Sequence, residues 1–477
     1  MKANKIQVVE GTASFASKDT LAVLKKDGTK ENMTFDKIII AAGSVPAVPP
    51  IPGVKENANC VDSTGALSFE EIPKSLLVIG GGVIGIELAT AYSKFGTEVT
   101  VVEAAPKLLP MMDGELTAQL RKLMEAKGVK IMTDAKVQSV EAAAVGAKVN
   151  VEIGGKVQPF AAEKVLVAVG RRTDTEALGL DAVGIANDRG RITVNDKMET
   201  NVPNVYAIGD CLGKVMLAHV ASAQGEVAAE NALGENAVYN GATNPSCVYT
   251  DPEFAGVGLT EEKAKEMGIA YQVGKFPLMA NGKSLIMNGG VGSIKFIIGT
   301  EYKEVLGVHI LGPRATDLIG ECALAIGMEA TVEDIIAAIH AHPTVTEDGQ
   351  RKRLWQQRKE QFIFPINKNQ QYKYEKKQKI KDKQKLDEHK CSLLRYTAAV
   401  SRICSRPSPL KREQDLARQN LLHNSFFCGC AEPIAASLLS CYFRHITIIK
   451  EDASADFVSV GAFSFAKFGD TKIKKPP

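Results

Sequence analysis

A glycine-rich turn between an apolar stretch and a helical pattern carries the clearest chemistry in this sequence. The turn, GGGVIG, spans residues 80–85 and follows the apolar residues 76–79. In such a turn Gly80 permits a tight bend, Gly82 lets the backbone approach a pyrophosphate, and Gly85 lets the helix pack closely on the strand. The helix N-terminus then attracts the anion. The pattern predicts a dinucleotide site; a glycine-rich turn in another kind of α/β protein is the alternative.

An acid stands where dinucleotide-binding folds recognise the adenine ribose. Glu103 follows a second apolar stretch, 99–102, and lies 23 positions after Gly80. A carboxylate about 20 residues after the turn accepts hydrogen bonds from the ribose hydroxyls. NADP would require a basic residue for its extra phosphate, and residues 104–106 supply none. We therefore expect NAD rather than NADP.

Two further strand patterns end in residues that suit a ligand. The strand pattern at residues 37–40 runs into Ala-Gly-Ser at 42–44, where a ligand could approach the backbone; an ordinary strand-to-loop glycine is the alternative. The stretch 205–208 ends in Gly-Asp, and Asp210 could accept hydrogen bonds from a polyol or a ribose. A helix N-cap or turn aspartate is the alternative there.

A histidine-rich segment, HAHPTVTE at residues 340–347, follows a helical pattern. Its two histidines could simply interact with the helix dipole. The more specific interpretation is a histidine base whose other ring N–H donates a hydrogen bond to Glu347. That bond would fix the tautomer and raise the basicity of the histidine. The earlier His219 is expected to be an ordinary helix or turn histidine.

The elements that must position these residues follow from periodicity and from Gly and Pro punctuation. Strands alternate with helices over residues 76–170, which predicts a parallel sheet with an antiparallel insertion, and residues 246–347 predict a compact α+β module. We expect helices over residues 83–95, 115–127, 218–233, 315–328 and 332–340, and strands that include 6–10, 21–24, 37–40, 130–132, 136–140, 148–153, 164–168, 293–298 and 305–311.

Charge and composition narrow the function classes. The 477 residues carry a net charge of +3, but residues 351–390 hold a net of +9, so the rest of the chain is mildly acidic and gives no reason to expect a nucleic-acid partner. Nine scattered cysteines fit a reducing compartment. We expect no targeting segment at the N-terminus and no membrane span, since the apolar run 433–443 is too short. Residues 351–477 are expected to be disordered or an erroneous gene end; a basic interaction tail is the alternative.

Six motifs occur in one order over residues 5–347. They are Ala-Gly-Ser at 42–44, the glycine turn with Glu103, Val-Gly-Arg at 169–171, Ala-Ile-Gly-Asp at 207–210, Tyr-Thr-Asp-Pro-Glu at 249–253 and His-Ala-His-Pro-Thr…Glu at 340–347. In this order the chain resembles the flavoprotein pyridine nucleotide-disulfide oxidoreductases with two dinucleotide folds, and within them the dihydrolipoamide dehydrogenases. The resemblance implies redox chemistry with FAD and NAD as cofactors and no metal.

The resemblance also implies roles for individual residues. The NAD site would be lined by Gly80, Gly81, Gly82, Val83, Ile84, Gly85, Ile86, Glu87, Glu103, Val137 and Gly170. Contacts to FAD would come from Ala42, Gly43, Ser44, Asp210, Met216, Leu217, Ala218 and His219. His342 would deprotonate the dihydrolipoyl thiol, oriented by Glu347, and would serve the flavin and disulfide of the other subunit of a homodimer.

The implied fold class is α/β, with two Rossmann-like FAD/NAD domains, the first incomplete, and an α+β interface or dimerisation domain. The expected boundaries are 1–75 for the remainder of the FAD-binding domain, 76–195 for the NAD-binding domain, 196–243 for the return segment of the FAD domain, 244–350 for the interface domain and 351–477 for the tail. Partners would be lipoyl domains of 2-oxo acid dehydrogenase or glycine cleavage complexes. The compartment would be the mitochondrial matrix in a eukaryote and the cytoplasm in a bacterium.

One departure from the family bears on activity. The family begins with an FAD-binding GxGxxG and a redox Cys-x4-Cys, whereas residues 1–75 contain Cys60 as their single cysteine. We therefore expect the chain to bind NAD without oxidising dihydrolipoamide. Two alternatives stay open: a non-catalytic NAD-binding remnant, and another FAD/NAD disulfide reductase or NADH oxidase.

Overall fold

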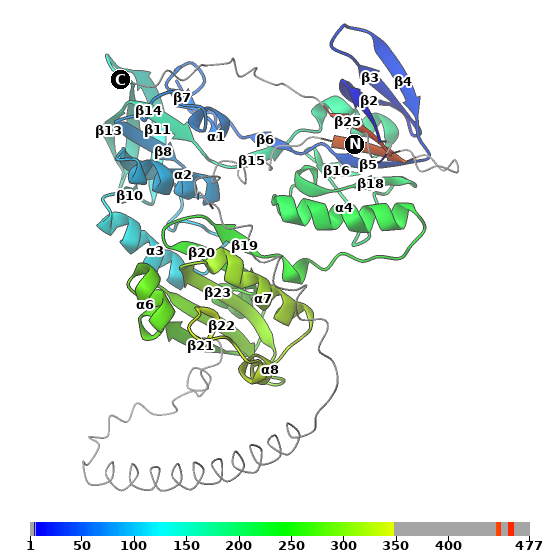
Figure 1. Ribbon diagram of the computed structural model, residues 1–477. Coiled ribbons are helices and arrows are strands. Elements are labelled where there is room, and N and C mark those ends of the chain that lie inside the picture. Colours follow the sequence, from blue (N-terminus) through cyan, green and yellow to red (C-terminus); the bar gives the residue numbers. More distant parts are fainter. Residues whose placement is uncertain (1–3, 5, 348–444, 450–456, 462–477) are drawn as a thin grey trace, which may run out of the picture. The chain divides into compact units, whose positions relative to one another are not determined.

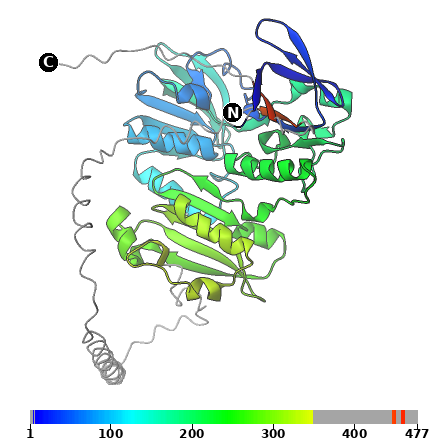
Figure 2. The ribbon, with the colours of Figure 1, turned by 45° about the vertical axis from the view of Figure 1, so that its right-hand side comes forward.

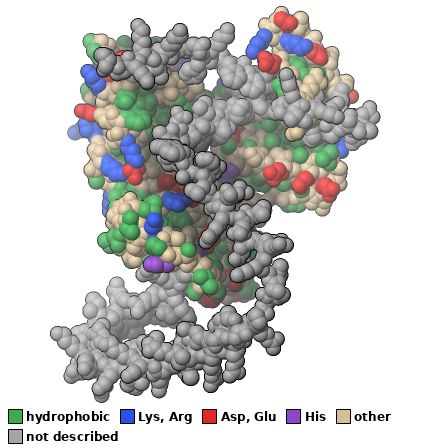
Figure 3. All heavy atoms as spheres, viewed as in Figure 1, with side chains coloured by type: hydrophobic (Ala, Val, Ile, Leu, Met, Phe, Trp, Pro, Cys, Tyr) green, Lys and Arg blue, Asp and Glu red, His purple; other side chains and the backbone are tan. Residues whose placement is uncertain are grey.

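The computed structural model describes residues 4, 6–347, 445–449 and 457–461 (Figure 1). Four apolar cores organise these residues, and two of them draw on the same three strands, 75–79, 98–102 and 164–167. No helix in the described part of the chain is both long and apolar enough to cross a membrane. On the face drawn in Figure 3, basic and acidic side chains are interspersed over the described elements.

The first sheet has the order β1-β25-β24-β5-β18. Its strands are β1 (Gln7–Glu10), β5 (Lys37–Ala41), β18 (Val205–Ala207), β24 (His445–Ile449) and β25 (Phe457–Gly461). The helix α4 (Ala218–Ala232) contributes Ala228 and Ala232 to the core that also buries Ile38 and Ile40, and both views show it running along this sheet (Figure 1, Figure 2). Beside it lies an antiparallel sheet of β2 (Thr12–Ser17), β3 (Thr20–Leu24) and β4 (Lys30–Thr34).

The second large sheet is parallel throughout and has the order β10-β9-β8-β14-β7. Its strands are β7 (Cys60–Val61), β8 (Ser75–Ile79), β9 (Glu98–Val102), β10 (Lys130–Met132) and β14 (Lys164–Val167), and its helices are α1 (Ser63–Ala66), α2 (Val83–Lys94) and α3 (Gly114–Ala126). An antiparallel sheet of β11 (Ala135–Ala142), β12 (Ala147–Ile153) and β13 (Lys156–Ala162) is inserted between β10 and β14. The predicted parallel sheet with an antiparallel insertion is confirmed.

The third large sheet is antiparallel, with the order β19-β20-β23-β22-β21. Its strands are β19 (Ser246–Val248), β20 (Glu253–Gly258), β21 (Tyr271–Pro277), β22 (Ser293–Gly299) and β23 (Val305–Gly312). The accompanying helices are α5 (Glu261–Glu266), α6 (Gly282–Asn288), α7 (Ala315–Gly327) and α8 (Val332–Ala337). The predicted α+β module is confirmed, although β19 to β21, α5 and α6 were not expected.

Two predictions about secondary structure need correction. The helix expected over residues 332–340 ends at Ala337, because the backbone is already extended at Ala338 (φ −65°, ψ 134°). The histidine-rich segment therefore follows the helix as a loop. The disorder expected for residues 351–477 does not hold at β24 and β25, which are strands rich in β-branched and aromatic residues. The rest of that tail lies outside the described residues.

Candidate active site

The glycine turn connects β8 to α2, and close backbone contacts restrict two of its positions to glycine. Gly80 has φ +113°, and a Cβ there would lie 2.4 Å from the Ala168 carbonyl oxygen. A Cβ on Gly85 would lie 2.2 Å from the Gly80 carbonyl oxygen, so a larger residue would push α2 away from β8. Gly82 is the N-cap of α2 and makes no side-chain cap, and a Cβ on it would meet no atom within 4 Å. The helix thus begins at an open space where its first N–H groups can meet a phosphate.

Glu103 lies against this turn. Its Oε2 accepts a hydrogen bond from the Gly81 N–H at 2.6 Å, and its Oε1 accepts one from the Ala105 N–H at 2.6 Å. The strand β11, which carries Val137, begins where the Ala135 N–H donates to the Glu103 carbonyl. The carboxylate predicted for a ribose is therefore at the carboxyl end of β9, beside the turn predicted for the pyrophosphate.

The remaining residues of the predicted NAD site surround the same turn. Within α2, Val83 is exposed, Ile84 is partly exposed and Ile86 is fully buried in the core. Gly170 lies two residues after Ala168, has φ +121° and faces open space. Ile86 thus supports the helix from inside the core rather than from the open side of the turn.

Glu87 faces the third sheet. Its Oε1 accepts a hydrogen bond from the Tyr249 N–H at 2.9 Å. Burial raises the pKa of the Glu87 carboxyl, and the bond from Tyr249 partly opposes that rise. Nearby, burial raises the pKa of the Cys247 thiol to about 11, so this cysteine stays protonated near neutral pH.

The residues predicted to contact FAD form a second cluster at the ends of β5 and β18. Ser44 Oγ donates to Asp210 Oδ2 at 2.5 Å, and Gly43 has φ +73°. Arg171 donates from Nε to Ser44 Oγ at 2.7 Å and from its terminal nitrogen to the Ser44 carbonyl at 2.8 Å. Arg171 was not assigned a role from the sequence, although its place after Gly170 in the Val-Gly-Arg motif was a signal. Three motifs far apart in the sequence thus meet here.

The stretch 216–219 leads into α4, and His219 lies in the first turn of that helix. Met216 and Leu217 are partly exposed, Ala218 and His219 are exposed, and His219 Nε2 lies 2.8 Å from the Pro245 carbonyl oxygen. Within α4, Gln224 Oε1 accepts a hydrogen bond from the N–H of Gly209, the residue before Asp210. This bond ties α4 to the second cluster.

The two histidines of the loop after α8 are separated into different environments. His342 Nδ1 lies 2.7 Å from Glu347 Oε2, with the His342 side chain 78% exposed and the Glu347 side chain 14% exposed. His340 Nε2 instead lies 2.6 Å from Glu321 Oε1 on α7, and its side chain is 9% exposed. If His342 donates its Nδ1 proton to Glu347, its Nε2 lone pair is free to accept a proton at the surface. Asn281 also reaches Glu347, at 3.5 Å, and was not identified from the sequence.

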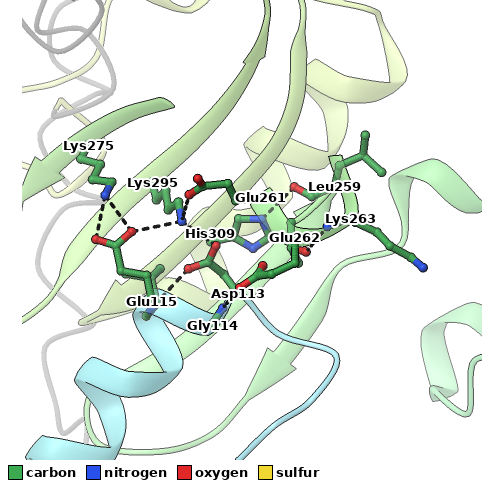
Figure 4. A network of polar contacts seen from close by, with 12 residues as sticks. Asp113, Gly114, Glu115, Leu259, Glu261, Glu262, Lys263, Lys275, Lys295 and His309 are labelled. Atoms are coloured by element: carbon green, nitrogen blue, oxygen red, sulfur yellow. Dashed lines mark hydrogen bonds and ion pairs between the residues drawn. The ribbon is translucent and has the colours of Figure 1, made fainter. Parts of the chain in front are cut away.

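A buried ion cluster joins the third sheet to the N-terminus of α3 (Figure 4). Lys295 on β22 is 2% exposed, and its Nζ lies 2.8 Å from Asp113, 2.8 Å from Glu261 and 3.1 Å from Glu115. Asp113, whose side chain is fully buried, also N-caps α3 by accepting from the Leu116 N–H. The sequence signal that could have found it is a lysine inside the apolar strand pattern of β22.

Comparisons with known proteins show clear relatives. The family described as "Pyridine nucleotide-disulphide oxidoreductase" matches residues 1–225, and its dimerisation domain matches residues 244–353. The chain is 45% identical over 351 residues to the dihydrolipoyl dehydrogenase of Thermus scotoductus, covering 73% of this chain and 74% of that protein. It is 42% identical over 350 residues to the mitochondrial dihydrolipoyl dehydrogenase 1 of Arabidopsis thaliana, covering 72% of this chain and 69% of that protein.

Among solved structures, the HOCl-induced flavoprotein disulfide reductase of Escherichia coli is similar with a TM-score of 0.66 and 29% identity. The match covers 72% of this chain and 78% of that one.

Proposed function

Because the chain belongs to the pyridine nucleotide-disulphide oxidoreductase family, we propose that it is a dihydrolipoyl dehydrogenase-type protein that binds NAD and FAD and holds the base for a dihydrolipoyl thiol. The predicted resemblance is confirmed, and the family has an α/β FAD/NAD-binding domain and a dimerisation domain. The observation that carries the proposal is the contact between His342 Nδ1 and Glu347 Oε2 at 2.7 Å.

The NAD site is proposed at the turn between β8 and α2. A pyrophosphate there would meet the N–H groups of the first turn of α2 beyond Gly82, and Glu103 would accept hydrogen bonds from the ribose hydroxyls. The open space at Gly82 is the observation that fits such a group. The cluster of Ser44 and Asp210, with the 216–219 stretch, is proposed for FAD, whose flavin when bound supplies electron and hydride transfer.

The base is proposed to act through a defined tautomer. In this proposal the Nδ1–H of His342 donates a hydrogen bond to Glu347, which leaves Nε2 unprotonated on a mostly exposed side chain. Nε2 can then take the proton of a dihydrolipoyl thiol, and the resulting thiolate is the nucleophile for a disulfide. No two cysteines in residues 1–477 have the Cys-x4-Cys spacing, so we expect the chain alone to bind NAD without oxidising dihydrolipoamide.

The matched dimerisation domain supports a homodimer. We propose that His342 acts on the site of the partner subunit, in keeping with its exposed position. The domain boundaries 76–195, 196–243 and 244–350 are proposed on the same basis, with lipoyl domains as partners. The compartment is proposed to be the mitochondrial matrix or the bacterial cytoplasm, since relatives include mitochondrial and bacterial enzymes.

The test is to purify the chain and measure its flavin content, oligomeric state and dihydrolipoamide-dependent NADH formation. A yellow, FAD-containing dimer that binds NAD but forms no NADH is the expected result. A colourless monomer would favour the alternative of a non-catalytic NAD-binding remnant. Dihydrolipoamide-dependent NADH formation by the pure chain would contradict the expected inactivity, and turnover with other disulfides alone would favour a different reductase.

A further inference from the structure

Asn281 connects the helix α6 to the loop that carries the proposed base. Its side chain is fully buried. Its Oδ1 accepts a hydrogen bond from the Ser284 N–H at 2.6 Å, which caps the N-terminus of α6. Its amide nitrogen donates to the Thr344 carbonyl at 3.0 Å and lies 3.5 Å from Glu347 Oε1. One buried amide therefore contacts both the backbone and the acid of the loop.

The capping function does not by itself require asparagine. Serine, threonine and aspartate supply the same acceptor, as Thr331 does for α8 and Thr260 does for α5. What asparagine adds is a pair of N–H donors on the opposite side, directed at Thr344 and Glu347. A buried amide that lost these partners would be left unsatisfied, so the arrangement holds the loop against α6.

The position of Glu347 matters because its other oxygen holds the imidazole. Glu347 Oε2 lies 2.7 Å from His342 Nδ1, while Oε1 faces Asn281. His342 is mostly exposed, so packing does little to fix its ring, and the contact with Glu347 decides which nitrogen carries the proton. We propose that Asn281 is a positioning residue that fixes Glu347 and thereby the Nδ1–H tautomer of His342. This inference rests on the proposed function for the role of His342 as base.

The experiment measures the tautomer of His342 directly, by ¹⁵N chemical shifts of the histidine rings in the purified chain at a pH where they are neutral. The signal is assigned by its loss in His342→Gln. Asn281→Ser and Asn281→Thr both keep the capping acceptor and remove the amide donors. Asn240→Ser is the matched control, because Asn240 caps the turn at Gly241–Thr243 by the same kind of bond.

Wild type and Asn240→Ser are expected to show mainly the Nδ1–H tautomer. Asn281→Ser is expected to lower the ratio of Nδ1–H to Nε2–H by roughly fivefold, as the loss of one net hydrogen bond predicts. A wild-type ratio in either Asn281 variant, with the remaining histidine signals unshifted, would overturn the proposal, as would a wild-type protein dominated by Nε2–H. The tautomer measurement requires no turnover, so it can support this inference even if the chain fails to bind flavin or to oxidise dihydrolipoamide. Equally, the proposed function can hold even if the tautomer ratio does not depend on Asn281.

Discussion

Replacing Lys295 with methionine should destabilise the protein strongly, because it leaves the buried carboxylate of Asp113 without a cation. Lys295 is 2% exposed and Asp113 is fully buried, and their charged atoms lie 2.8 Å apart. Glu115 would keep a partner, since Lys275 Nζ lies 2.7 Å from it, but Asp113 would lose its cation. Methionine has a similar length and apolar character, so the change mainly removes the charge.

Breaking a buried pair by removing one partner costs about 3–5 kcal/mol, much of it the penalty of the remaining unpaired charge. With an m-value of about 3 kcal/mol/M, such a loss lowers the urea midpoint by roughly 1–1.7 M. The exposed ion pair between Lys275 and Glu115 provides a comparison for the buried pair. Lys275, with 51% of its side chain exposed, should contribute less than about 1 kcal/mol to its pair with Glu115.

The assay is urea unfolding followed by far-UV circular dichroism for Lys295→Met, for Lys275→Met as the matched control, and for Lys295→Met combined with Asp113→Asn. Asparagine at 113 can still cap α3 but carries no charge, so the double variant should recover a large part of the loss. Equal midpoints for the two single lysine variants would refute the reasoning.

Three further outcomes are expected. The hydrogen bond from Lys295 is the main cause that lowers the pKa of Glu261 from 4.5 to about 2. The stability that ionised Glu261 contributes is therefore complete above pH 4.5 and is lost as the pH falls toward 2. In Lys295→Met the urea midpoint should vary less between pH 4.5 and pH 2. Gly82→Ala should fold normally and bind NAD⁺ more weakly in calorimetric titration, whereas Gly85→Ala should lower the thermal midpoint, since its Cβ would lie 2.2 Å from a carbonyl oxygen. In a chain supplied with the family's redox cysteine segment, His342→Gln should reduce dihydrolipoamide turnover by about 10²–10⁴-fold, and a smaller loss would favour a different reductase.

Local sequence patterns predicted those parts of the fold whose interacting residues lie close together in the sequence. The turn at 80–85, the helix that follows it and Glu103 are close in sequence and have strong propensities, so they could be placed without knowing the rest of the chain. The pairing of His342 with Glu347 could also be predicted, because the two residues lie only five positions apart along one loop. In both places a short segment determines its own geometry.

What the sequence did not reveal depends on contacts between distant segments. Lys295 meets Asp113 across 182 positions, and Arg171 meets Ser44 across 127. Neither pairing has a periodic signature, because each partner is specified only once the sheets are assembled. The early end of α8 was missed for a related reason: the apolar pattern continues past Ala337, whereas the backbone leaves the helix there.

The most direct test of the central claim is a calorimetric titration of the purified chain with NAD⁺ and with NADP⁺, repeated on Glu103→Gln. A carboxylate held beside the turn by the N–H groups of Gly81 and Ala105 should accept from free ribose hydroxyls and repel a 2′-phosphate. We expect NAD⁺ to bind at least about tenfold more tightly than NADP⁺, with this preference reduced in the variant. Equal binding of the two nucleotides, or a preference for NADP⁺, would contradict the account.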